Sequence, residues 1–404
     1  MLAGSLLAGA ASTSLALADQ APAGGSSSDD APAYSIRTMI QLRYQQTSAS
    51  IAPGLSALVA RTYPTPSIAA DSLRVIKDTA RDRDGLRLRR AFLAFDIEPT
   101  AYLRGEVLLD FARLLYPDDP YAQGPTQMVR VASAELTPID SLAIEVGITH
   151  VPFSVLEKFH DTGLDVAEEG PTHELLHRLR IVGSDVGVVF RVAPLKEKEW
   201  LDVRAGVFDS GSTGSQSSRV PGLFAARATT RPFDPVQLGA GLAWRPHTVD
   251  AWWEELRFRY QDFDSGAAFS ADVSVLFDRF VFRSEWLTGD RTDNDVTIPL
   301  KQRRGDARTF MSAWGMAALR WPAFGVVFVP AARAEYLDTD REHANLGGIL
   351  HLSGALNVDL TERVRLMVDV SRHYVQYGTR NWNFDLVRYD TDYVSGTLQL
   401  QLKL

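Results

Sequence analysis

Hydrophobic and polar residues alternate along the last twelve positions of the chain. Val394, Leu398, Leu400, Leu402 and Leu404 fall on one side of an extended backbone, opposite Thr397, Gln399, Gln401 and Lys403. This period of two predicts a β-strand with one apolar and one polar face. Similar segments recur about every twenty residues, which is typical of a transmembrane β-barrel whose side chains alternate between lipid and lumen.

The alternation predicts an all-β fold, a closed antiparallel barrel. Candidate strands lie at 36–45, 86–97, 102–111, 129–137, 142–149, 186–192, 201–207, 222–230, 236–244, 255–261, 268–277, 280–288, 309–319, 326–337, 345–358, 363–374 and 393–404. Single-chain bacterial barrels have an even number of strands. We therefore assign 256–261 to a loop and predict sixteen strands, with short turns at one end and long loops, including 375–392, at the other.

Composition narrows the class further. The chain has a formal charge of −8 and no cysteine, and 45% of its residues are apolar. An acidic chain lacks the basic face of a nucleic-acid binder, and without cysteine it has neither disulfides nor thiolate metal sites. The mean hydropathy of −0.10 excludes a bundle of membrane helices but suits a barrel, in which apolar residues occupy every second position.

The first 33 residues differ from the rest of the chain. Residues 1–18 are apolar or small and close on Ala16-Leu17-Ala18, which is typical of a signal-peptide cleavage site. Residues 19–33 form an Ala/Pro/Gly/Ser linker, and 34–404 form the predicted barrel. No later segment reaches the about 18 uninterrupted apolar residues that a spanning helix requires. We expect export through a signal peptide and insertion into the outer membrane of a Gram-negative bacterium.

The polar phase of the strands points several arginines toward the lumen. These candidate pore-lining, anion-binding residues are Arg37, Arg43, Arg90, Arg104, Arg130, Arg204, Arg227 and Arg283. Guanidinium groups keep their charge, and rings of arginine on a pore wall favour anions. The alternative is that each arginine pairs with an inward carboxylate such as Glu106, Asp110, Glu145, Asp202 or Glu285, which would give a neutral mesh that stiffens the barrel.

Several segments resemble the phosphate-selective porin O/P family. They are the arginine-rich GLRLRRAFL at 85–93, LDFA at 109–112, VGITHVPFS at 146–154, DVGV at 185–188 and VRLMVD at 364–369. Together they span roughly 35–404 in the family's order. The resemblance implies a 16-stranded, trimeric porin whose third loop folds into the lumen and narrows it. The family's lysine-rich phosphate-binding constellation is not evident in this chain.

The segment 150–183 corresponds to that third loop and has a net charge of −3. Its charged residues are Glu157, Lys158, Asp161, Asp165, Glu168, Glu169, Glu174, Arg178 and Arg180. An acidic loop facing an arginine-bearing wall would set up a transverse field that orients dipolar solutes. Such a constriction suits a general diffusion pore better than a dedicated phosphate site.

One rival motif lies in the same loop. His173-Glu174-Leu175-Leu176-His177 matches H-E-x-x-H, in which two histidines on one helical face bind zinc and the glutamate is the general base. A zinc hydrolase is therefore the alternative function. The motif is short, and no helical domain that could supply a third ligand surrounds it. The competing interpretation is a loop helix with two solvated histidines and no metal.

The sequence as a whole predicts an outer-membrane porin rather than an enzyme. It would pass small hydrophilic solutes or inorganic anions, with an anion preference from the wall arginines and possible selectivity for phosphate. We expect no cofactor, because the closed barrel satisfies its own backbone in lipid. The expected partners are the transported solutes, outer-membrane lipid and two further copies in a homotrimer, and no nucleic acid.

Overall fold

The computed structural model describes residues 33–51, 84–114, 128–156, 166, 170–179, 181–193, 200–209, 222–245, 266–291, 308–338, 341, 348–380 and 386–403. The first strands are β1 (Ala33–Ile51), β2 (Gly85–Thr100), β3 (Leu103–Asp110), β4 (Val129–Ile139), β5 (Leu142–His150), β6 (Ser184–Val192), β7 (Leu201–Phe208), β8 (Leu223–Phe233) and β9 (Val236–Arg245). They continue with β10 (Gly266–Leu276), β11 (Phe280–Arg291), β12 (Arg308–Leu319), β13 (Trp321–Ala323), β14 (Val326–Asp338), β15 (Gly348–Asp359), β16 (Val364–Arg380) and β17 (Leu386–Lys403). Two helices are described, η1 (Phe111–Leu114) and α4 (Pro171–Arg178).

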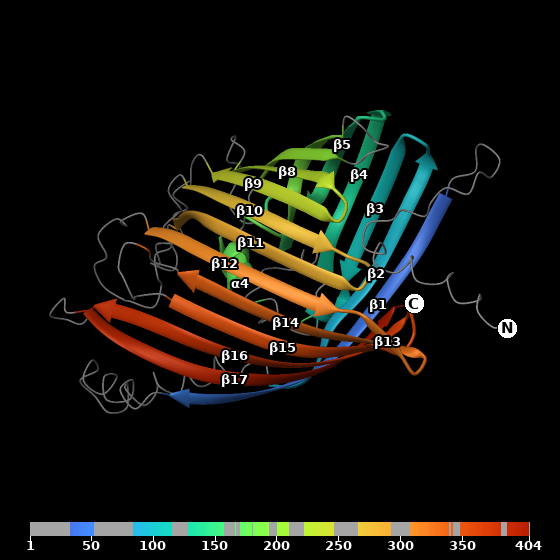
Figure 1. The fold of residues 1–404 in the computed structure, drawn as a ribbon. Helices are drawn as coiled ribbons and strands as arrows, with labels where there is room; N and C mark the ends of the chain where they lie inside the picture. Colours follow the sequence, from blue (N-terminus) through green and yellow to red (C-terminus); the bar gives the residue numbers. More distant parts are fainter. Residues whose placement is uncertain are drawn as a thin grey trace.

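The strands form one closed antiparallel barrel (Figure 1). Each strand pairs with its neighbours in the chain, and β17 pairs with β1 to close the sheet. β13 has only three residues and pairs with β14 beyond the end of β12, so the described residues form sixteen long strands. The predicted fold class and strand number are confirmed. The segment 256–261, which we assigned to a loop, lies outside the described residues.

The two faces of the strands have the polarity that the alternation predicts. In β17, Leu398 is exposed on the outside, whereas Thr397 and Gln399 are buried on the inside. The neighbouring β1 repeats the arrangement, with Leu42 outside and Gln41 inside. A closed barrel with an apolar outer face satisfies its backbone within the sheet and presents side chains suited to lipid.

A β-bulge in β2 explains why the phase of the arginine-rich segment was ambiguous. Arg90 pairs with Gln41 and Leu88 pairs with Leu42, so Arg89 has no partner position in β1. The extra residue shifts the alternation by one position. Arg87 and Arg90 consequently lie on the same inner face although they are three residues apart.

The predicted loop at 375–392 is wrong for most of its length. β16 continues to Arg380 and β17 begins at Leu386, and their pairing extends to Arg380 opposite Leu386. Beyond the apolar band the outer face no longer needs apolar side chains, so the period of two fades although the strands continue. Backbone pairing persists there without leaving a pattern in the sequence.

Exposed aromatic residues lie toward both ends of the barrel wall. Those at the end with the short turns are Tyr34, Tyr102, Trp200, Phe233, Phe277, Phe280, Trp321 and Phe324, and those nearer the long loops include Tyr44, Phe111, Trp244, Phe269, Trp286 and Tyr336. Aromatic girdles of this kind flank the apolar band of transmembrane barrels. Among the described helices, none is both long and apolar enough to cross a bilayer.

A matched pair of substitutions in β17 tests this assignment of faces. Leu398→Arg puts a charge on the outer face near the middle of the strand, and we expect it to lower the free energy of unfolding by about 2–4 kcal/mol. Thr397→Asn adds a polar side chain of similar size to the inner face opposite Asp369 and should cost much less. Urea titration of the barrel reconstituted in lipid measures both. Equal losses would mean that the phase of β17 is wrong.

Candidate pore and its third loop

The connection between β5 and β6, residues 151–183, is the third loop. Its described residues pack against the inner wall of the barrel, with α4 inside the ring of strands (Figure 1). The prediction that this loop folds into the lumen is confirmed.

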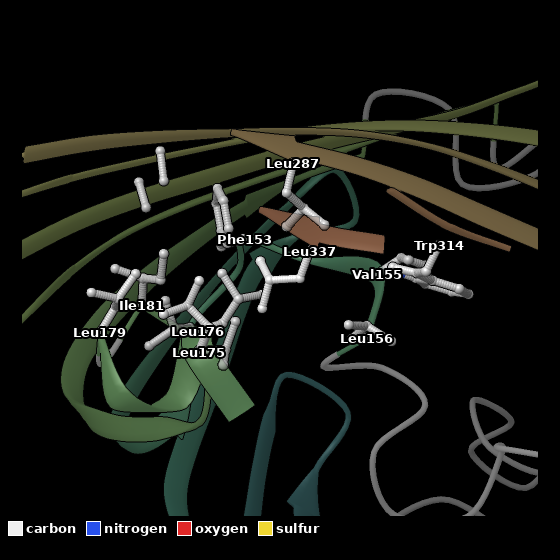
Figure 2. Close-up of a cluster of buried hydrophobic side chains, with 14 of the residues drawn as sticks. Phe153, Val155, Leu156, Leu175, Leu176, Leu179, Ile181, Leu287, Trp314 and Leu337 are labelled. Atoms are coloured by element: carbon white, nitrogen blue, oxygen red, sulfur yellow. The ribbon is translucent and has the colours of Figure 1, made fainter. Parts of the chain in front are cut away.

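Apolar packing holds the loop against one side of the wall. Loop and wall side chains share a single buried cluster, part of which Figure 2 shows. The loop contributes Phe153, Val155, Leu156, Leu175, Leu176, Leu179 and Ile181, and the wall contributes Leu223, Leu287, Phe310, Trp314 and Leu337 among others. Each buried leucine or phenylalanine contributes about 1.5–3 kcal/mol relative to its exposed state. The loop is therefore an integral part of the fold.

A buried ion pair fixes the start of the loop. Arg227 of β8 contacts Asp272 of β10 at 2.6 Å, and both side chains are almost fully buried. Arg227 also donates a hydrogen bond to the carbonyl oxygen of Phe153 at 3.2 Å, and Ser270 donates to the same oxygen at 3.0 Å. A side chain at position 241 would collide with that oxygen, so the close approach requires Gly241.

A second arginine holds the end of the loop helix. Arg245 of β9 donates a hydrogen bond to the carbonyl oxygen of Leu179 at 3.0 Å. The last carbonyl groups of a helix lack partners within the helix, and a cation at this end also interacts favourably with the helix dipole. α4 is therefore tied to the wall at its C-terminal end.

The H-E-x-x-H motif lies within α4, so it is helical as both interpretations of the motif expected. It does not form a metal centre in the described structure. The rings of His173 and His177 meet edge to face with centroids 4.3 Å apart. His173 is buried rather than solvated, and the side chain of Glu174 lies outside the described part. Among the described residues no group of three or more His, Cys, Asp or Glu is arranged to hold a metal ion. The zinc-hydrolase alternative is therefore not supported.

Most of the predicted acidic constriction lies outside the described residues. This applies to Glu157, Lys158, Asp161, Asp165, Glu168, Glu169 and Arg180. Arg178 ends α4, but its side chain also lies outside the description. The transverse field that these charges would create stays a prediction.

The predicted wall arginines fall into distinct groups. Arg37 and Arg104 share Asp96, with contacts of 2.9 and 3.2 Å, and Arg37 also contacts Glu106 at 3.3 Å. Arg204 contacts Asp202 at 3.4 Å. These side chains are partly exposed at the end of the lumen with the short turns. Arg37, Arg104 and Arg204 therefore pair with inward carboxylates, as the alternative to anion binding predicted.

Three other predicted arginines are buried. Arg227 is the loop anchor described above, and Arg130 and Arg283 are each more than nine-tenths buried. Burial separates them from solutes that move through open solvent. Arg227 therefore acts on the third loop, whatever it contributes to the charge of the wall.

A third group lies on β1 and β2. Arg43 donates a hydrogen bond to Gln399 at 3.0 Å, and the Arg90 guanidinium lies 5.8 Å from the Phe92 ring centroid. Arg43 pairs directly across the sheet with Arg87, a residue absent from the predicted set.

Sequence reasoning missed Arg87, Arg89 and Arg191. The bulge hid the first two, because it breaks the alternation inside the arginine run. Arg191 contacts Asp202 at 2.9 Å, and its position between the outward Phe190 and Val192 already indicated that it faces inward. The signal for Arg191 was present in the sequence, whereas the signal for the other two was not.

Solved structures with similar architecture come from outer-membrane proteins. The anion-selective porin from Comamonas acidovorans has a TM-score of 0.56 and 11% identity, covering 93% of this chain and 100% of that one. OmpT of Vibrio cholerae, in a trimer form, has a TM-score of 0.55 and 8% identity over 93% and 100% of the chains. The outer membrane channel DcaP of Acinetobacter baumannii has a TM-score of 0.53 and 10% identity, covering 93% of this chain and 99% of that one.

The chain has the porin fold. At these identities the likeness shows the architecture and not the transported solute. No protein-family model and no curated protein sequence matches the chain, so the resemblance to the phosphate-selective family is not confirmed.

The buried pair at the start of the loop gives a second prediction for this porin fold. Arg227→Met leaves Asp272 as an uncompensated buried charge, and we expect it to lower the free energy of unfolding by about 3–5 kcal/mol. The double variant Arg227→Met/Asp272→Leu removes both charges and should recover most of that loss. Unfolding of the parent, Arg227→Met, Asp272→Leu and the double variant in lipid, followed by tryptophan fluorescence, gives the coupling. Additive losses would contradict the pairing.

Proposed function

We propose that the protein is a porin of the outer membrane that passively passes small hydrophilic solutes, with a preference for anions. The observation that carries the proposal is the third loop packed inside the closed barrel. It narrows the lumen on one side and leaves polar and charged side chains on the inner faces of β1–β7. A wide barrel with an internal constriction is an aqueous channel rather than a packed core.

The anion preference rests on the arginines of β1 and β2. Arg43 and Arg87 are direct cross-strand neighbours, and Arg90 pairs with Gln41 one step further along the same face. Like charges at such close range raise the local positive potential, which favours anions over cations. The neighbouring Gln399 and Gln401 of β17 add amide groups to this part of the wall. Inorganic phosphate is one anion such a wall would accept.

The proposal also includes the location, export and oligomeric state of the protein. The apolar outer face fits lipid, and residues 1–18 fit a signal peptide for export to the outer membrane of a Gram-negative bacterium. The trimer form of the V. cholerae OmpT neighbour supports a homotrimer. Diffusion through such a pore involves no bond chemistry and needs no cofactor.

Conductance tests the proposal directly. In a planar bilayer under a KCl gradient we expect discrete conductance steps and a reversal potential whose sign indicates selectivity for anions over cations. Titration with phosphate then separates a general pore from a selective one, since block at low phosphate indicates a specific site. Folded, heat-modifiable protein that never conducts would rule the porin out.

Charge-removing variants locate the selectivity. Arg43→Gln and Arg87→Gln should each shift the reversal potential toward cations, and their combination should shift it further, because each removes a positive charge from the same patch of wall. Arg363→Gln is the matched control. It removes the same charge from an exposed turn between β15 and β16 and should leave the potential unchanged. An equal shift in the control would place the selectivity elsewhere.

A further inference from the structure

One lateral row of the inner wall contacts the third loop at two places, residues 154–155 and Thr172. The cross-strand register puts Asp272, Glu285, Trp314, Glu335 and His351 next to one another on β10, β11, β12, β14 and β15. Two carboxylates of this row, Glu285 and Glu335, accept hydrogen bonds from backbone groups of the loop. Buried carboxylates are costly unless such partners are present.

Glu285 binds the first part of the loop. One carboxylate oxygen accepts a hydrogen bond from the Val155 backbone at 3.1 Å. The other accepts from the Ser154 hydroxyl at 2.8 Å and from the Trp314 indole N–H at 3.1 Å. All three donors point at one fully buried side chain, so the position of residues 154–155 depends on an acceptor at that place.

Glu335 binds the loop where α4 begins. It accepts a hydrogen bond from the backbone N–H of Thr172, one of the helix N–H groups that have no partner within the helix. Its other oxygen contacts Arg333 at 2.6 Å, and both side chains are fully buried. Gly170, with a φ of 55°, passes so close that a side chain there would collide with this carboxylate.

Trp314 connects the two binding points. Its indole donates to Glu285, and the guanidinium of Arg333, the partner of Glu335, lies 5.1 Å from its ring centroid. Residues 154–155 and the start of α4 are thus held by one continuous set of contacts, Glu285–Trp314–Arg333–Glu335. Networks of this kind are coupled, because removing one member leaves its buried neighbours without partners.

We propose that Glu285, Trp314 and Glu335 are positioning residues that set the width of the channel by fixing the third loop at residues 154–155 and at the start of α4. This inference rests on the proposed pore function. None of the three lines the open channel; each acts through the loop. Loss of one anchor lets the loop leave the wall, so the permeability and size limit of the channel change while the barrel itself persists.

The test is the single-channel conductance and solute-size limit of Glu285→Gln in the full-length, reconstituted protein. Glutamine keeps the shape but has one acceptor oxygen instead of two, so either the Val155 N–H or the Trp314 N–H loses its acceptor. We expect a changed mean conductance, larger current fluctuations and a shifted polymer-exclusion limit. Asp369→Asn is the control, since this equally buried inner-wall carboxylate accepts from Ser371 on its own strand. It should conduct like the parent.

A second substitution tests whether the effect of Glu285→Gln arises from its contact with Trp314. Trp314→Phe on the Glu285→Gln background removes the conflicting donor, and the glutamine NH₂ can then face Ser154. We expect the double variant to return toward the parental conductance. If Glu285→Gln does not assemble, Trp314→Phe alone, which removes one donor and keeps an aromatic ring, carries the same test.

An engineered disulfide provides the reverse control. The hydroxyls of Thr172 and Ser312 are in hydrogen-bond contact, and the chain has no other cysteine. Oxidised Thr172→Cys/Ser312→Cys should suppress the fluctuations of the Glu285→Gln background, and reduction should restore them. Folded Glu285→Gln channels that match the parent in conductance and size limit would overturn the inference and leave the pore intact. A parent protein without conductance would refute the pore itself.

Discussion

Pairing between β1 and β17 is the constraint on which the rest of the structure depends. It closes the ring, so each of the sixteen long strands in the described part of the chain has a neighbour on both sides and can turn an apolar face to lipid. The interior then has to accommodate a loop that has no sheet of its own. Wall side chains supply the missing partners: Arg227 and Ser270 bond the Phe153 carbonyl, and Glu335 bonds the Thr172 N–H. Some of the buried charges of the lumen, Arg227, Arg245, Glu285 and Glu335, thus form hydrogen bonds with the backbone of the loop.

Identical residue types at equivalent inward positions therefore have different roles. Arg204 and Arg227 are direct cross-strand neighbours on β7 and β8. Arg204 is partly exposed beside Asp202, whereas Arg227 is buried against Asp272 beneath the loop. Each arginine has its own carboxylate, which is what allows two like charges to lie side by side. The two arginines differ because the third loop covers Arg227 and leaves Arg204 partly exposed. Arg227 therefore anchors the loop, whereas Arg204 stays on the open wall.

The sequence predicts strands well where their two faces differ. In β17 the contrast between Leu398 and Gln399 defines both the strand and its phase, and repetition of such contrasts yields the number of strands. In β12 the contrast is absent, because Phe310, Trp314 and Met316 face inward while Met311 and Leu319 face outward. The inner face of β12 is apolar because the loop covers it. Its phase becomes evident only when that contact is known.

The anchors of the loop were beyond sequence reasoning for a related reason. Ser154 and Glu285 are 131 residues apart, and Thr172 and Glu335 are 163 apart. Nothing in the local pattern marks Glu285 as different from the exposed carboxylates, and the alternation indicates only that it faces inward. The bulge at Arg89 hid two wall arginines in the same way, since a single extra residue leaves no compositional trace. Local periodicity defines the faces, whereas long-range contacts define the roles.

The row that holds the loop also continues along the wall into β15, β16 and β17. Beyond Glu335, the rings of His351, His373 and Tyr393 stack at centroid distances of 4.3 Å across β15, β16 and β17. His351 lies 3.8 Å from the Glu335 carboxylate, so the stack begins at a loop anchor. β17 in turn pairs with β1, the strand that carries Arg43. Close-packed rings transmit displacement rather than absorb it. The wall that fixes the loop is therefore connected to the strand that carries Arg43 through stacked rings and backbone pairing.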